Sequence, residues 1–220
     1  NGSAYAVSVR GKRVRDWLPA VEVRGEGIFI QFAQDKLKSW ESDSGVTKRT
    51  EVLNSRYNQM AEERGFSPRV ITPRFIFLHT LAHLLIRQLS FECGYGSASL
   101  RERIYCNESA DQPNMAGILI YTASGDADGT LGGLVRQGKP DFFSALVSKA
   151  VASGYWCSSD PLCIESQGQG LGSLNLAACH ACALLPETSC EEFNRLLDRT
   201  LVVGLPDDPK IGFLSCMLSV

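Results

Sequence analysis

Residues 157–190 read CSSDPLCIESQGQGLGSLNLAACHACALLPETSC and hold five of the chain's eight cysteines: Cys157, Cys163, Cys179, Cys182 and Cys190. Two thiolates three positions apart, as in Cys179-His180-Ala181-Cys182, can hold one tetrahedral Zn²⁺ from a tight turn, and a second pair from elsewhere closes the site. The spacing therefore predicts a structural zinc bound by four of these five cysteines. It leaves open which four.

Two other interpretations of the cysteines remain. They could be buried apolar thiols or disulfides, since free cysteine is often simply part of the core. A redox-active pair is the second alternative, but such motifs follow a strand and open a helix, and residues 174–178 show no clear strand pattern. Cys190 lies between Ser189 and Glu192, a spacing typical of a capping box, so we expect it in the first turn of a helix where the dipole favours the thiolate.

Length and composition indicate one soluble, folded domain or a large piece of one, because 220 residues with 44 % hydrophobic content can bury a core. The formal charge of −2 argues against a strongly basic nucleic-acid binder, so any DNA-binding surface must be local. No signal sequence or membrane span is predicted, and we expect a cytoplasmic protein. The start Asn-Gly-Ser suggests an excised or processed chain. We expect residues 1–17 to be a leader or remnant of a preceding domain, 18–204 the zinc-binding domain and 205–220 a tail.

The pattern along the chain predicts an α/β (α+β) fold: a small mixed sheet wrapped by helices, with a cysteine-ligated zinc knuckle near the C-terminal end. Residues 21–32 look like a hairpin turning at 25–27, and 115–123 is a continuous apolar strand. Residues 99–106 fit either a helix start or a strand. Helices are expected at 33–40, 50–64, 72–90, 140–153 and 190–200, with 72–90 apolar nearly all round and therefore central.

His79, His83 and Arg87 stand four residues apart on that central helix, which aligns them as one polar stripe. The spacing differs from the HExxH zinc proteases at Thr80, where their general-base glutamate would stand. We favour histidines satisfied by buried partners, and contact with a phosphate or a partner protein is the alternative.

A glycine-rich loop follows the 115–123 strand and holds Asp126 and Asp128. It lacks the glutamate of a calcium loop, with Gln137 in its place, and the Gly-Lys-Ser/Thr of a P-loop. We interpret it as a strand-to-helix turn, with anion binding as the alternative, and expect it to lie near the polar stripe. A metal-dependent hydrolase or nuclease using His79, His83, Asp126 and Asp128 is a second hypothesis for the function.

Several motifs together resemble a known family: HTLAH at 79–83, RERIY at 101–105, IYTAS at 120–124, DGTLGGL at 128–134, ACHAC at 178–182, and Cys190 with Asn194 and Asp198. They are similar to the C-terminal zinc-binding domain of DrmB-type subunits of the prokaryotic DISARM anti-phage system. More distantly they resemble the MrfA zinc-binding domain of DNA-repair helicases. The resemblance spans about residues 18–204. The insert after Cys163 is longer than in the helicase-linked pattern.

The resemblance implies that Cys179, Cys182 and Cys190 are zinc ligands, with Cys163 or Cys157 as the fourth. It also implies a superfamily 2 helicase subunit as partner and a complex that acts on invading DNA. The chain itself contains neither a Walker A motif nor an acidic Walker B sequence after a buried strand. We therefore expect a non-catalytic domain that supports or positions the motor.

Overall fold

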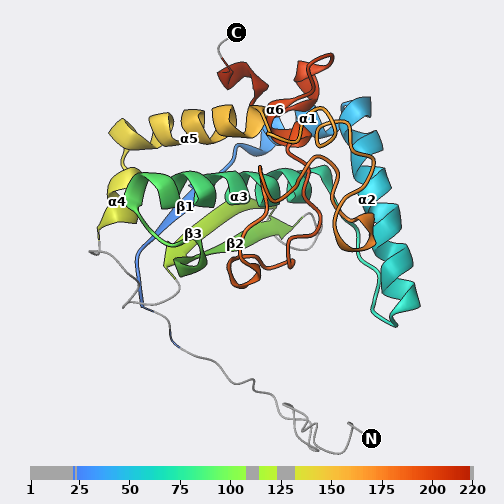
Figure 1. The fold of residues 1–220 in the computed structure, drawn as a ribbon, viewed down its shortest axis with the longest axis horizontal. Coiled ribbons are helices and arrows are strands. Elements are labelled where there is room, and N and C mark those ends of the chain that lie inside the picture. The colour runs from blue at the N-terminus through green and yellow to red at the C-terminus, as the bar shows by residue number, and fades with distance from the viewer. Residues whose placement is uncertain (1–21, 23, 108–113, 123–131, 219–220) are drawn as a thin grey trace, which may run out of the picture.

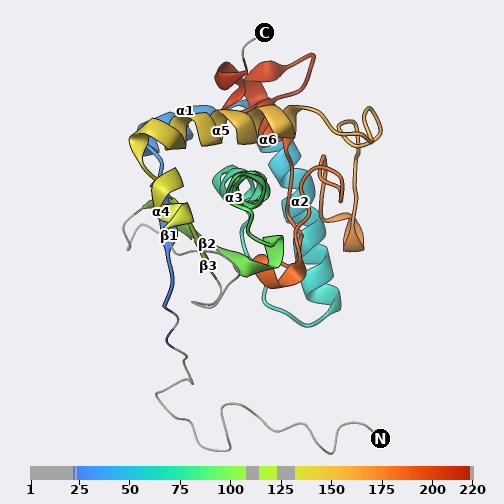
Figure 2. The same cartoon turned by 60° about the vertical axis from the view of Figure 1, so that its left-hand side comes forward.

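A computed structural model describes residues 22, 24–107, 114–122 and 132–218 of the chain. One long helix, α3 (Pro73–Cys93), runs through the middle of the fold. Figure 2 looks along this helix and shows the other elements arranged around it: α5 on one side, the sheet on another and α2 on a third. The central, buried helix predicted from the sequence is confirmed.

The remaining helices and strands, in chain order, are β1 (Gly27–Gln31), α1 (Gln34–Glu41), α2 (Ser44–Glu63), β2 (Leu100–Asn107), β3 (Met115–Thr122), α4 (Gly133–Gln137), α5 (Pro140–Tyr155) and α6 (Thr200–Val203). Short 3₁₀ turns occupy Ser97–Ser99, Leu171–Ser173, Glu187–Ser189, Pro209–Ile211 and Ser215–Met217. The α/β class is confirmed, and the helices expected near 33–40, 72–90 and 140–153 are present. In Figure 1 the segment between α5 and α6 winds beside the sheet and α2 without forming an α-helix or a strand.

The three strands form a sheet in the order β1-β3-β2, and both pairings are antiparallel. The predicted mixed sheet is therefore an antiparallel one in the described part of the chain. The predicted hairpin over 21–32 is wrong, because Gly27 begins β1 and pairs with Tyr121 of β3 instead of forming a turn. Of the two alternatives for residues 99–106, the strand is confirmed: β2 covers Leu100–Asn107, in which Leu100 and Glu102 face the interior and Arg101 and Arg103 face solvent.

Local signals explain where the long helices begin. Thr72 caps α3 by accepting a hydrogen bond from the Phe75 N–H at 3.2 Å, and Pro73 fills the first helical position. Gly94 ends the same helix in the left-handed conformation. Helix α2 begins at Ser44, six residues before the predicted 50, because the Asp43 side chain caps it by accepting from the Gly45 N–H at 2.8 Å.

The helix predicted at 190–200 is wrong. Cys190 has an extended backbone, and Phe193, Asn194 and Leu196 have positive φ angles. The reason is tertiary: the Asn194 side chain accepts from the Leu185 N–H at 2.9 Å and donates to the Leu185 carbonyl at 2.7 Å. Side-chain bonds to backbone thus replace the helical ones, and helix α6 begins only at Thr200.

The described residues after 204 pack against the core. Ile211 is buried. The centroid of the Phe213 ring lies 4.8 Å from that of Phe77 in α3 and 5.5 Å from that of Trp40 in α1. The boundary of the zinc-binding domain at 204 stays a prediction. Among the described helices, none combines the length and the hydropathy that a membrane span requires.

Candidate metal centres

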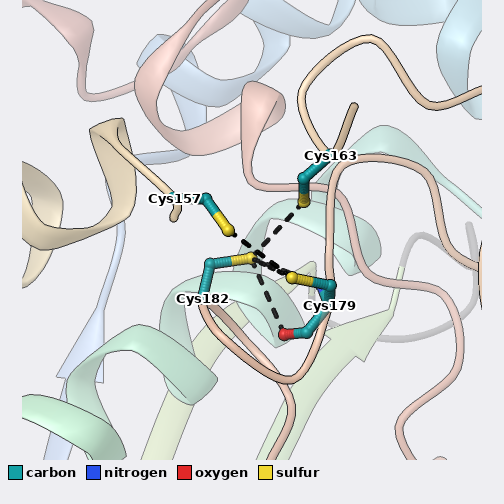
Figure 3. Close-up of side chains that lie close together, drawn as sticks. All are labelled: Cys157, Cys163, Cys179 and Cys182. Atoms are coloured by element: carbon teal, nitrogen blue, oxygen red, sulfur yellow. Dashed lines mark hydrogen bonds between the residues drawn. The ribbon is translucent and has the colours of Figure 1, made fainter. Parts of the chain in front are cut away.

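Cys157, Cys163, Cys179 and Cys182, the four-cysteine group, bring their sulfur atoms within 4.8 Å of one another. The Sγ–Sγ distance is 3.5 Å between Cys157 and Cys179, 3.7 Å between Cys163 and Cys182, and 3.8 Å between Cys179 and Cys182. A zinc–sulfur bond of about 2.3 Å in a tetrahedron places ligand sulfurs about 3.8 Å apart. Figure 3 shows the four side chains pointing toward one another. Their geometry fits one tetrahedral zinc ion.

The first pair of cysteines is positioned by Asp160, which lies between them in the chain. Its carboxylate accepts the N–H of Cys157 at 2.9 Å and the N–H of Ile164 at 3.0 Å. The same carboxylate forms an ion pair with Arg199, whose side chain is fully buried and also donates to the carbonyls of Gly154 and Tyr155 at 2.9 Å. One buried arginine therefore connects the end of α5, the 157–163 loop and the start of α6.

The second pair is positioned by α3. The Arg87 guanidinium donates to the Ala181 carbonyl at 2.8 Å and to the carbonyls of Leu184 at 3.4 Å and His180 at 3.5 Å. We expected the polar stripe, Arg87 included, to lie near the glycine-rich loop, with contact to a phosphate or a partner as the alternative. In the structure Arg87 holds the turn that carries Cys179 and Cys182. Asp126 and Asp128 lie outside the described residues.

Electrostatics within the four-cysteine group favour one thiolate in particular. Burial opposes ionisation of Cys179, but hydrogen bonds from the Cys157 thiol and the backbone N–H of Ala181 lower its pKa to about 7. Burial raises the pKa of the Cys163 and Cys182 thiols. Four thiolates in contact repel one another unless a cation compensates their charge, which is the role that a bound zinc performs.

Cys190 lies in a different place. Its sulfur is 3.1 Å from His79 Nε2, and it belongs to a buried His–Glu–Cys group of His79, His83, Glu102 and Cys190, whose candidate ligand atoms all lie within 4.8 Å of one another. The sequence grouped Cys190 with the other four cysteines and expected the histidines to have buried partners. The structure gives the histidines such partners, Glu102 and Cys190, and separates Cys190 from the four-cysteine group.

Burial opposes every charge in the His–Glu–Cys group, but attraction among its members outweighs burial. The Glu102 carboxylate raises the pKa of His79 well above its usual value and raises that of His83. The two imidazoles in turn hold the pKa of Glu102 far below its ordinary value of 4.5. Hydrogen bonding to the histidines lowers the pKa of the Cys190 thiol to about 7. The group is therefore built for two negative charges and a compensating positive charge.

Sequence reasoning missed three residues of these sites: Glu102, Asp160 and Arg199. Glu102 could have been found, because reading 100–106 as a strand places its charge on the same face as the apolar Leu100, which is costly without a partner. Asp160 and Arg199 carry no such local signal.

Comparison with known proteins shows two similarities. Residues 81–183 match the family described as the MrfA Zn-binding domain (MZB). The chain is also 43 % identical over 208 residues to "DISARM protein DrmB" of Bacillus paralicheniformis, an alignment that covers 92 % of this chain and 36 % of that protein. The chain thus spans about a third of the length of this curated relative. The MZB match includes all members of the four-cysteine group and ends before Cys190.

Proposed function

We propose that this chain, which carries an MrfA Zn-binding domain and resembles DrmB over nearly its whole length, is a zinc-stabilised accessory part of a DISARM-type anti-phage defence subunit. The resemblance in sequence supports the place in a defence subunit, and the convergence of the four-cysteine group supports the zinc. Its contribution would be to support or position other components of the defence complex.

The zinc ligands in this proposal are Cys157, Cys163, Cys179 and Cys182. The observation that carries the assignment is the pair of Sγ–Sγ distances that join two separate segments, 3.5 Å between Cys157 and Cys179 and 3.7 Å between Cys163 and Cys182. Four thiolates complete the tetrahedron, so no coordination position is left for water or a substrate. Catalytic zinc sites keep one such position open, and this site therefore fits a structural role.

The proposed partners are a superfamily 2 helicase subunit and, through the complex, foreign DNA in the cytoplasm. The name of the relative, a DISARM protein, supports membership in a defence system of several subunits. The net charge of −2 favours DNA contact through the assembled complex over a strong, general attraction of this chain to DNA. Co-purification of the 220-residue chain with a superfamily 2 helicase subunit of a DISARM system tests the first part. Absence of a complex in gel filtration would overturn it.

The non-catalytic role is tested on the purified chain. We expect hydrolysis of neither ATP nor DNA, because no phosphate-binding loop is present and the cysteine site is closed. Nuclease activity that disappears in both His83→Ala and Asp126→Ala would support the hydrolase hypothesis instead. The Cys216→Ala variant, changed at an exposed side chain outside both metal-ligating groups, is the control and should behave as the unchanged chain.

A further inference from the structure

The buried His–Glu–Cys group combines three parts of the chain that are distant in sequence. His79 and His83 come from α3, Glu102 from β2, and Cys190 from the loop after the Glu187–Ser189 turn. Both imidazoles are fully buried, and Glu102 is 2 % exposed. Three polar atoms in the group have no hydrogen-bond partner among the described residues: His79 Nδ1, His83 Nε2 and Glu102 Oε2. Buried polar atoms are seldom left in this condition, and a ligand bound within the group would supply a partner for His83 Nε2 and for the Glu102 carboxylate.

Hydrogen bonding indicates which nitrogen of His83 is available. Its Nδ1 lies 2.8 Å from the Ala183 carbonyl, a pure acceptor, and therefore carries the proton. In the neutral ring, Nε2 then presents a lone pair toward Glu102 Oε1, 3.5 Å away. Two lone pairs that face each other across this distance repel, so either a proton or a metal cation lies between them. A ring nitrogen fixed to a backbone carbonyl is also the usual second contact of a histidine that binds metal.

Cys190 is prepared as a thiolate. Its sulfur accepts the backbone N–H groups of Asn194 at 3.2 Å and Glu192 at 3.3 Å, in addition to its contact with His79 Nε2. Glu102 Oε1 lies 3.0 Å from the same His79 nitrogen. One nitrogen thus faces a sulfur and a carboxylate oxygen together, and a single N–H cannot point at both.

We propose that His79 Nε2, His83 Nε2, the Glu102 carboxylate and Cys190 Sγ bind a second Zn²⁺, distinct from the ion of the four-cysteine group. Zinc bonds of about 2.0–2.3 Å in a tetrahedron separate nitrogen from sulfur by about 3.5 Å and nitrogen from oxygen by about 3.4 Å. The observed contacts of 3.0–3.5 Å need only small movements to reach those values. Two imidazoles and a thiolate select zinc over calcium or magnesium, which take oxygen ligands.

Charge balance supports a divalent ion. One thiolate and one carboxylate carry two negative charges, and Zn²⁺ with two neutral imidazoles makes the buried site neutral overall.

Burial also decides between a metal site and a nucleophilic one. A cysteine beside a histidine and a glutamate is a known catalytic arrangement, but a nucleophile must be reached by its substrate. Cys190 is only 7 % exposed and the other members are 0–2 % exposed. With four protein ligands the site is closed, so the second zinc would stabilise the junction of α3, β2 and the 183–194 loop. Ala183, which holds His83, directly follows Cys182 and so links the two sites.

The wild-type 220-residue chain provides the first test and needs no variant. Elemental analysis of protein purified without added metal is expected to give two zinc ions per chain. X-ray absorption at the zinc edge should report five sulfur and three nitrogen or oxygen ligands over the two ions, from the eight residues of both groups. One zinc per chain, unchanged by zinc titration and surrounded by four sulfurs, would overturn the second site and leave the proposed function intact. One zinc with a mixed nitrogen–sulfur shell would support the second site and overturn the zinc of the four-cysteine group.

Paired variants assign the ions. Cys190→Ala and, independently, His83→Ala are expected to lose one zinc and keep an all-sulfur shell around the other. Cys182→Ser should lose the all-sulfur ion and keep the mixed one, while Cys216→Ala should keep both. If soluble Cys190→Ala and His83→Ala both retain two zinc ions, the proposal fails.

Discussion

The two metal-ligating groups are built in opposite ways. The His–Glu–Cys group takes three of its four members from α3 and β2, elements whose own hydrogen bonds and apolar packing fix their positions. The four-cysteine group lies in residues 157–182, where the described chain has only one 3₁₀ turn and one isolated β-bridge. Side chains such as Asp160 and Arg87 hold that segment in place.

This difference indicates where each metal contributes its energy. In the irregular segment the backbone bonds close single turns, such as that from the Cys163 N–H to the Ser159 carbonyl at 3.0 Å, and no α-helix or strand fixes the ligands, so zinc binding and local folding are one event. The apolar cluster around these cysteines is small, with Ala178, Ala183 and Leu197 as its other buried members. In the regular part of the fold, meaning α3 and the sheet, apolar packing around α3 places the members of the His–Glu–Cys group before any metal binds. The irregular segment should therefore respond more strongly to loss of its ligands.

The largest effect is expected from Cys182→Ser. Loss of the zinc from the four-cysteine group should destabilise the chain by roughly 5 kcal/mol or more, because the free energy of a structural zinc is folding free energy. Limited proteolysis should cut first within 157–182, and helix α3 should be protected longer. Denaturant unfolding and peptide mapping measure both. The Cys216→Ser variant should behave as wild type, and a Cys182→Ser protein with unchanged unfolding midpoint would refute the comparison.

Arg199→Ala is expected to have the next largest effect. It leaves the Asp160 carboxylate without its ion-pair partner and the carbonyls of Gly154 and Tyr155 without their donor. Removing one partner of a buried ion pair lowers the free energy of unfolding by about 3–5 kcal/mol. Chemical denaturation gives that value, and competition with a chelator should show weaker zinc binding. A loss below about 1 kcal/mol would mean that the 157–163 loop is held by zinc alone.

The sequence predicted the regular part of the molecule well because its signals are local. The apolar run at 75–86, the Thr72-Pro73 start and Gly94 define α3 without any knowledge of the rest of the chain. The clustering of cysteines likewise predicted zinc, and the MZB match supports it. These are properties of residues close together in sequence.

The irregular part could not be predicted in the same way. The helix expected at 190–200 is replaced by a loop in which the Asn194 side chain bonds to the backbone of Leu185, and Cys190 contacts His79 of α3 instead of the other cysteines. The capping-box signal at Ser189 and Glu192 was overridden, since the Ser189 hydroxyl donates to the Ser97 carbonyl and Glu192 pairs with Arg69. Such contacts link residues many positions apart, and no local period reveals them.

Arg87→Ala should have a moderate effect. The guanidinium satisfies carbonyls in the turn between Cys179 and Cys182, and its removal is expected to cost about 1–2 kcal/mol. Amide hydrogen exchange in residues 180–184 should accelerate, and zinc affinity should fall slightly. The neighbouring Gln88→Ala, which removes only a bond to Glu92 on the same helix, is the control. Equal behaviour of the two variants would show that the turn needs no support from α3.

The smallest effect is expected in the regular part, at Glu26. Its carboxylate accepts from the Tyr95 hydroxyl and from the N–H groups of Gly132 at 2.9 Å and Val135 at 3.2 Å. Burial alone would raise the pKa of Glu26, but these bonds lower it below the usual 4.5. A depressed carboxyl pKa stabilises the fold at neutral pH, and this contribution is lost as the pH falls below about 4.5 through the folded-state pKa.

Glu26→Gln tests this prediction, because the amide cannot titrate. At pH 7 the variant should be less stable by about 1 kcal/mol or less, since the strands and α3 still hold the region. The stability difference between wild type and variant should shrink as the pH falls from 6 to about 3, while acid release of zinc affects both proteins alike. Unfolding curves at several pH values give the difference directly. A stability difference that widens as the pH falls would mean that Glu26 is protonated in the fold. A loss of stability at pH 7 as large as that of Arg199→Ala would mean that the regular part also depends on single polar contacts.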